Sequence, residues 1–273
     1  MSSSVLFDAP GPKTVARHRL YTLLTIVGLL GILAFFAYRM LVTRQFEYDK
    51  WEVFLTPRYI RFILVDGLLN TLGMAVFAII AAIVFGLVFG VGKLSDHGWL
   101  RWLSFAVVEF FRAVPVLLLM TFLFLQFAIG DGPLSPFWCV VLALMLYNGA
   151  VLAEVFRAGI NAVPSGQVEA AYALGLRKSQ VMVQIQLPQA VKTMLPAIIS
   201  QMVVALKDTS LGFYILAPGL TAVYRPIYQE FGNQVPAALV IAAIYIVVNL
   251  ILTWVATLVQ RRLLGERKVS ASA

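Results

Sequence analysis

Four charged residues lie in stretches of the chain that are otherwise apolar, and they are the first candidates for chemistry. Glu109 and Arg112 are three residues apart, so they share one face of a helix and can neutralise each other. Lys207 and Asp208 are adjacent, so their side chains point in different directions and need other partners. A charge inside a membrane span is costly and is usually paired or functional. Two interpretations stay open: the four residues line a translocation path or gate, or they form an ion-pair network that fixes the helix packing.

The sequence offers little else that could catalyse a reaction or supply energy. Its two histidines, His18 and His97, lie in basic segments beside apolar ones, where solvated side chains are expected. Residues 90–93, Gly-Val-Gly-Lys, resemble part of a phosphate-binding loop. However, Leu87 stands where that loop needs its first glycine, and Leu94 where it needs Ser or Thr. We therefore expect no catalytic residue, metal or bound cofactor, and energy for transport would come from an ion gradient or a partner chain.

The composition places the chain in a membrane. Of its 273 residues, 61% are apolar and 12% are charged, whereas a soluble domain is nearer half apolar and a quarter charged. The net charge of +8 is typical of basic loops on the cytoplasmic side of a membrane. Nucleic-acid binding is not expected, because no basic stripe interleaved with aromatic residues is present. The single cysteine, Cys139, excludes an internal disulfide and is expected to be a small buried side chain.

Six apolar stretches are long enough to cross a bilayer, which takes about 20 helical residues. The sequence therefore predicts an all-α integral membrane protein with six transmembrane helices. Segments that face the cytoplasm if the chain begins inside carry more lysine and arginine, by roughly two to one, so both termini are expected inside. Gly86 and Gly90 form a GxxxG pattern that predicts a close helix–helix approach. The predicted spans are 20–42, 66–92, 102–129, 137–154, 191–214 and 237–259, with cytoplasmic tails at 1–19 and 260–273 and an extracellular loop at 43–65.

A polar stretch interrupts the apolar chain at 168–190, with the sequence VEAAYALGLRKSQVMVQIQLPQA. Pro164 is expected to end the preceding helix. Ser165 is then expected to cap a new helix, with Glu169 in the first turn, where the helix dipole favours an anion.

Gly175 suits the left-handed turn that ends many helices. A second short helix, 177–187, should stop at Pro188. Ala170 and Ala171 keep the first helix slim. Two interpretations fit this shape: a slim helix that docks into a groove on another protein, or a surface hairpin packed on its own bundle.

The polar stretch contains a long, ordered motif. Glu169-Ala170-Ala171 is followed after three residues by Gly175 and after nine more by Ile185-Gln186-Leu187-Pro188. This pattern resembles the EAA loop of bacterial ABC importer permeases. From about Gly67 to the end of the last span, the sequence is similar to their polar amino acid branch, which includes histidine, glutamine, arginine and glutamate permeases. The other matching segments are 109–112 (EFFR) with Pro115, 154–160 (EVFRAGI), 163–164 (VP) with 166–167 (GQ), and 206–211 (LKDTSL).

The resemblance implies the permease of a type I ABC importer, with a five-helix core at 66–259 and the first span, 20–42, as an added anchor. It implies a second permease chain, identical or a sister, two ATPase subunits that bind ATP and Mg²⁺, and an extracellular substrate-binding protein. The EAA loop, about 155–190, would be the coupling helix that docks on the ATPase. The residues implied in coupling are Glu169, Ala170, Ala171 and Gly175.

The sequence is similar to the corynebacterial glutamate permeases within this branch, so glutamate is the expected substrate. It departs from the branch pattern at Ala113-Val114, Leu119 and Ser200. These positions are expected to line the membrane interior, so glutamine, arginine and histidine stay open as substrates. An ion-coupled secondary transporter is an alternative of another class, and it would work without an ATPase partner.

Overall fold

A computed structural model describes residues 11–264 of the chain. The chain divides into two compact units, Met1–Val53 and Phe54–Ala273. The predicted tails at 1–19 and 260–273 lie partly outside the described residues.

The smaller unit consists mainly of one long helix, α1 (Pro12–Val42), which begins earlier than the predicted span because a proline suits the first helical turn. Its side chains are exposed from residue 16 to residue 39, as expected of an apolar helix that faces lipid. The segment after α1 was predicted to be an extracellular loop at 43–65, but much of it is helical. It contains α2 (Asp49–Glu52), and the indole nitrogen of Trp51 donates to the carbonyl oxygen of Gln45 at 2.9 Å.

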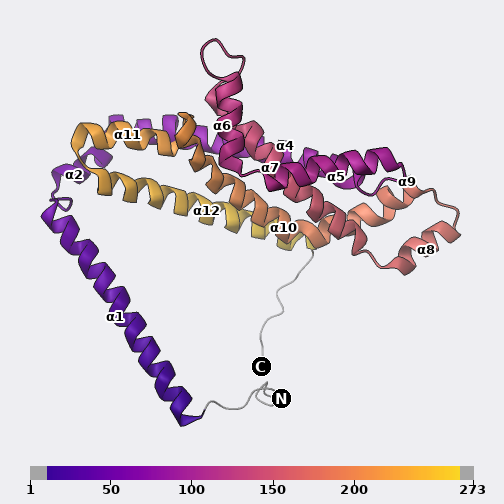
Figure 1. Ribbon diagram of the computed structural model, residues 1–273, viewed down its shortest axis with the longest axis horizontal. Coiled ribbons are helices and arrows are strands. Elements are labelled where there is room, and N and C mark those ends of the chain that lie inside the picture. Colours follow the sequence, from indigo (N-terminus) through magenta and orange to yellow (C-terminus); the bar gives the residue numbers. More distant parts are fainter. Residues whose placement is uncertain (1–10, 265–273) are drawn as a thin grey trace. The chain divides into compact units, whose positions relative to one another are not determined.

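The larger unit is a helical bundle, and the described residues contain no β-strand (Figure 1). Five helices of the two units are long and apolar enough to cross a membrane, and a bent pair makes a sixth if it counts as one span. The elements, including the 3-10 helix at the unit boundary, are η2 (Val53–Leu55), α3 (Pro57–Arg61), η3 (Phe62–Leu69), α4 (Asn70–Gly92), α5 (Gly98–Ala113), α6 (Val116–Phe127), α7 (Pro136–Asn161), α8 (Ser165–Ala173), α9 (Lys178–Gln180), η4 (Val181–Gln186), α10 (Leu187–Asp208), η5 (Thr209–Ile215), α11 (Leu220–Phe231) and α12 (Gln234–Leu264).

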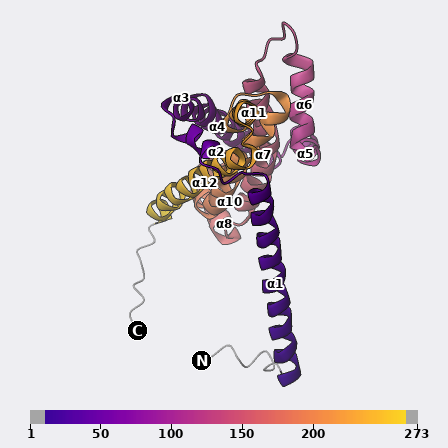
Figure 2. The ribbon, with the colours of Figure 1, turned by 90° about the vertical axis from the view of Figure 1, so that its left-hand side faces the viewer.

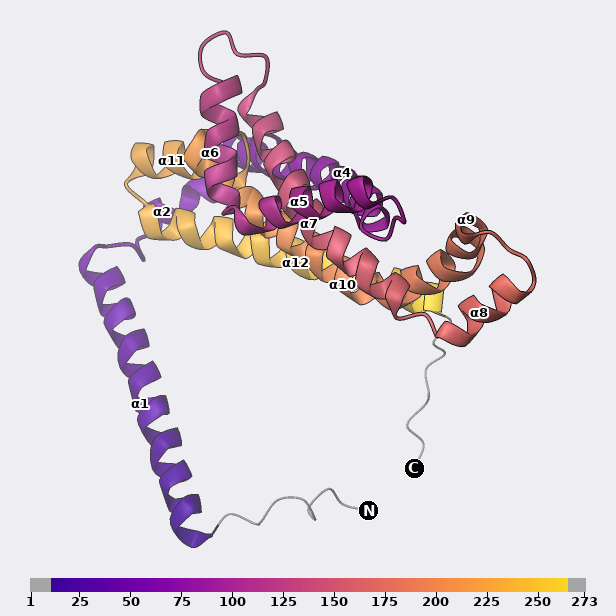
Figure 3. The ribbon, with the colours of Figure 1, turned by 45° about the vertical axis from the view of Figure 1, so that its right-hand side comes forward.

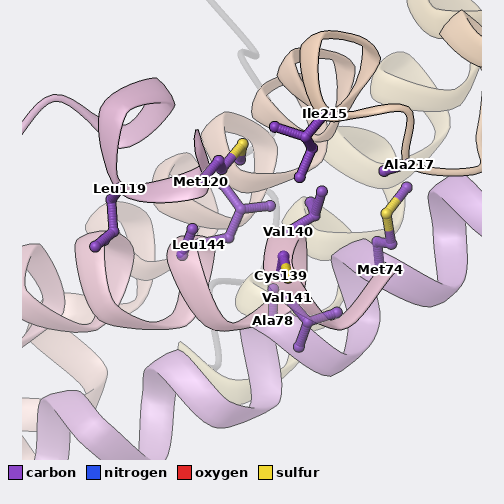
Figure 4. Packing of buried hydrophobic residues seen from close by; sticks show 11 residues of the cluster. Met74, Ala78, Leu119, Met120, Cys139, Val140, Val141, Leu144, Ile215 and Ala217 are labelled. Carbon is purple, nitrogen blue, oxygen red and sulfur yellow. The ribbon is translucent and has the colours of Figure 1, made fainter. Parts of the chain in front are cut away.

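Helix α7 is the centre of this bundle. It packs most extensively against α4 and also contacts α5, α6 and α10 (Figure 3). Within the most apolar stretch of α7, 61% is buried inside the protein, whereas the corresponding fraction for α12 is 17%. A cluster of apolar side chains from α4, α6, α7 and η5 surrounds Val140 and the buried thiol of Cys139 (Figure 4). The prediction that Cys139 is a buried packing residue is therefore confirmed.

The GxxxG glycines of α4 lie against the backbone of α7, as predicted. A Cβ atom on Gly86 would stand 2.8 Å from the Cβ of Leu152, and one on Gly90 would stand 2.8 Å from the carbonyl oxygen of Ala153. Both distances are too short for real Cβ contacts. Glycine at these two positions is therefore what allows α4 and α7 to approach so closely.

The predicted span 102–129 is broken into two helices, α5 and α6, which meet at an angle of 98°. Proline disfavours the helical conformation of the preceding residue, and Val114 is accordingly extended, with φ −79° and ψ 126°. Helix α6 therefore runs across the direction of the other helices of the bundle (Figures 1 and 2).

The prediction that a short helix stops at Pro188 is also wrong. The chain runs as one helical stretch from Lys178 to Ile215, with Pro188 in the first turn of α10. The preceding segment, Val181–Gln186, is a π-helix. Its wider turn changes the hydrogen-bond register just before the proline, so the missing N–H of Pro188 does not end the helix.

We predict that Gly90→Ala lowers the midpoint of thermal unfolding of the purified protein. The added methyl group would press on the α7 backbone, and such overpacking costs about 1–3 kcal/mol. Gly98→Ala is the matched control, because a Cβ atom on Gly98 has nothing within 4 Å. Equal unfolding midpoints for the two variants would contradict the close α4–α7 packing.

Candidate functional site: the EAA loop and an inner charge network

Helix α8 carries the EAA motif, and its first turn differs from the prediction. The residue before the helix is Pro164, whose φ of −54° and ψ of 129° lie outside the helical range, and no side chain caps the helix. Ser165 is already the first helical residue rather than its cap, because the chain turns helical directly after the proline. Glu169 accordingly lies beyond the first turn, which contains no acidic residue.

The C-terminal end of α8 has the left-handed turn that Gly175 predicts. Gly175 has a φ of +79°, in the left-handed region. Its N–H donates to the carbonyl oxygen of Tyr172 at 2.9 Å, and the N–H of Leu176 donates to the carbonyl oxygen of Ala171 at 3.2 Å. This pair of bonds is a Schellman motif, which satisfies the last carbonyl groups of a helix and turns the chain sharply.

Most of α8 is exposed at one end of the bundle (Figures 1 and 3). Ala171 is its only buried residue, whereas Glu169 and Ala170 are exposed. The exposed fraction of Tyr172 is 45%, and the next large apolar side chain, Leu174, is 82% exposed. The helix therefore presents small and apolar side chains outward, a surface suited to a groove on another protein.

Polar side chains hold this region on the bundle. The amide nitrogen of Gln189 donates to the Oε1 of Gln167 at 2.6 Å, which joins α10 to α8. The ammonium group of Lys178 donates to the carbonyl oxygen of Leu94 at 3.2 Å and pairs with the carboxylate of Asp96. The hydrogen bond from Lys178 lowers the pKa of Asp96 below its ordinary value.

An inner charge network joins the end of α4 to α5 and α7, and it consists of Lys93, Glu109, Arg112, Glu154 and Arg157. The side chain of Lys93 is only 6% exposed. Its ammonium group lies 3.3 Å from Glu109 and also pairs with Glu154. Each glutamate pairs in addition with the arginine three residues later, at 3.2 Å for Arg112 and 2.8 Å for Arg157. Glu109 and Arg112 therefore lie together, as their spacing predicts, in a network that ties three helices.

Sequence reasoning missed three members of this network. Glu154 and Arg157 repeat the spacing of Glu109 and Arg112, and that repeat was the available signal. They were overlooked because the fourth span was predicted to end at 154, whereas α7 continues to Asn161. Lys93 was assigned to a loop, but its side chain turns back into the bundle.

The structure separates Lys207 and Asp208 from this network. Neither lies within 4.0 Å of an oppositely charged group in the described part of the chain, 11–264. Lys207 lines an open pocket of about 860 Å³ between α10, η5, α11 and α12. Asp208 does not line it. The other polar residues of this pocket are Ser210, Tyr214, Thr221, Tyr224, Tyr245, Asn249 and Thr253.

Comparison with known proteins defines the class. Residues 82–265 match the model of the binding-protein-dependent transport system inner membrane component, and the chain belongs to this family. It is a multi-pass membrane protein, the permease subunit of an ABC importer for amino acids. The ATPase activity of such an importer resides in a separate subunit. The resemblance and the all-α fold inferred from the sequence are confirmed.

Individual amino acid permeases and a solved transporter structure are similar to most of the chain. The chain is 42% identical over 229 residues to the glutamate transport system permease protein GluD of Corynebacterium glutamicum, which covers 82% of this chain and 83% of that protein. It is 33% identical to the arginine transport system permease protein ArtQ of Bacillus subtilis, over 73% of this chain and 92% of that protein. A solved structure of an amino acid ABC transporter with histidines has a TM-score of 0.69 at 29% identity and covers 77% of this chain and 98% of the other.

Proposed function

We propose that this permease imports glutamate and that α8 is the coupling helix that docks on an ATP-binding subunit. The observation that supports coupling is the exposed end of α8, where Leu174 is 82% exposed beside a left-handed Gly175. The partners are two ATPase subunits carrying ATP and Mg²⁺, a second permease chain, and an extracellular substrate-binding protein. Closure of the ATPase dimer draws the two coupling helices together and opens the spans outward.

We predict that Gly175→Val abolishes glutamate uptake while the chain still inserts into the membrane, because a β-branched residue cannot easily adopt the left-handed turn. Uptake of labelled glutamate, normalised to the amount of chain in the membrane, measures this. Gly175→Asn is the matched control and should keep most of the uptake, since asparagine tolerates this conformation. Glu169→Lys should impair uptake too, by reversing a charge on the exposed face. Normal uptake by Gly175→Val would overturn the docking role of α8.

We propose that both termini and residues 155–190 lie in the cytoplasm. A cysteine placed at the exposed Ser179 should then resist a membrane-impermeant thiol reagent in intact cells and react once the cells are opened. The native Cys139 is buried, so the unmodified chain is the control for background labelling. Reaction of the new cysteine in intact cells would reverse the topology.

The pocket beside Lys207 supports a translocation path for an acidic amino acid. A carboxylate in a low-dielectric path needs a cation or a hydrogen-bond donor, and Lys207 lines the pocket whereas Asp208 does not. Asn249 lines the same pocket. Its amide nitrogen donates to the carbonyl oxygen of Tyr245 at 2.7 Å. Glu109 and Arg112, by contrast, fit better as members of the inner charge network.

We predict that cells lacking this chain lose uptake of labelled glutamate and that Lys207→Gln restores at most about a tenth of it, equivalent to roughly 1.4 kcal/mol. ATPase activity and assembly should persist, because only the path is altered. If Lys207 instead pairs structurally with Asp208, assembled protein and uptake will fall together, and removing Asp208 as well will restore both. Retained uptake of glutamine, arginine or histidine but not glutamate in the complemented cells would reassign the substrate.

An ion-coupled secondary transporter is the competing class, and it needs no ATPase. Copurification of an ATP-binding subunit with the tagged chain distinguishes the two classes. Uptake that persists when cellular ATP is depleted, but stops when the ion gradients are collapsed, would favour the secondary transporter.

A further inference from the structure

Lys178 connects the coupling loop to a segment that is distant in the sequence. It begins α9, directly after the turn that follows α8. Its ammonium group donates to the carbonyl oxygen of Leu94 at 3.2 Å and pairs with the carboxylate of Asp96. Both acceptors belong to residues 93–97, which we call the inner turn and which connects α4 with α5.

The contact between Lys178 and the inner turn can break and reform easily. Leu94 lies two residues beyond the end of α4, where the helix dipole favours a nearby cation. The side chains of Lys178 and Asp96 are 44% and 75% exposed, and exposed ion pairs contribute little to stability. Such a contact can be broken and reformed in each transport cycle at low cost.

Apolar packing between the two segments is incomplete. An open pocket of about 740 Å³ lies between them, lined by residues of α4, the inner turn and α5 on one side and by Lys178, Ser179, Met182 and Val183 on the other. The polar bonds of Lys178 cross this pocket, and Leu94 and Met182 also pack against one apolar cluster.

The inner turn is fixed at its other end by the inner charge network. Its first residue is Lys93, whose buried ammonium group pairs with Glu109 of α5 and Glu154 of α7. Lys93 and Leu94 are neighbours in the chain, so a pull on the Leu94 carbonyl acts directly on the backbone that carries Lys93. Ionic contacts and a short piece of backbone thus connect the coupling loop to three helices.

We propose that Lys178 is a positioning residue that makes the inner turn follow the coupling loop, so that movement of α8 is passed through Lys93 to α4, α5 and α7. The proposal rests on the coupling role proposed for α8. It adds a second route for the movement, beside the continuous helix that leads from α9 into α10.

The test uses the complete importer in cells and as a purified complex, with uptake of labelled glutamate and ATP hydrolysed per glutamate as readouts. Lys178→Gln should lower uptake by about fivefold and raise the ATP hydrolysed per glutamate, while the thermal unfolding midpoint changes little because the pair is exposed. Lys178→Arg should keep most of the uptake, since its guanidinium group can reach both acceptors. Lys192→Gln, which removes another exposed lysine, is the matched control and should leave both readouts unchanged.

Charge exchange separates this proposal from its rivals. Asp96→Lys combined with Lys178→Asp should recover part of the uptake that Lys178→Asp alone loses, because the ion pair is restored in reverse. Failure of the exchange to recover any uptake would overturn the proposal, because the ion pair with Asp96 would then not be what Lys178 supplies. Normal uptake in Lys178→Gln, together with loss of uptake in Gly175→Val, would refute the connection through Lys178 and leave the coupling role of α8 intact. Normal uptake in both would refute the coupling role itself.

Discussion

The close approach of α4 and α7 is the constraint on which the rest of the bundle depends. Helices in lipid gain little from hydrophobic burial against each other, so packing of small residues decides how near they come. Gly86 and Gly90 bring α4 against the α7 backbone. This close packing places the C-terminal end of α4 beside α7. Only because that end lies beside α7 can the ammonium group of Lys93 reach Glu154. The inner charge network is therefore a consequence of glycine packing in about the last two turns of α4.

The EAA loop, from α8 to η4, is held by a different kind of force. From α8 to η4 the buried side chains are few, among them Ala171 and Val181. Hydrogen bonds such as Gln189 to Gln167 therefore contribute much of what holds it. Regions with few buried apolar contacts open more easily than a packed core. The protein thus combines a rigid centre around α7 with an end that can be displaced without unpacking that centre.

The sequence allowed prediction of the features that depend on local rules. The apolar spans, the left-handed turn at Gly175 and the GxxxG approach all follow from residue types at fixed spacing. Features that depend on two competing local rules were missed: Pro188 does not end its helix because a π-helical turn precedes it, and Pro115 does break a stretch whose apolar length suggested one span. Contacts between distant segments, such as Lys178 with Leu94, leave no mark in the periodicity of either segment.

The uneven burial of the helices also has a consequence for how the chain enters the membrane during synthesis. Helix α1, apolar and exposed along its length, can partition into lipid by itself as soon as it emerges from the ribosome. The helical stretch Lys178–Ile215 is the least apolar of the candidate spans, and its Gln201 amide is bonded at 2.6 Å to Asn148 of α7. A segment with such polar groups is stable in lipid only once its partner is already there. The order of the helices along the chain thus supplies this span with a partner helix that has already been synthesised.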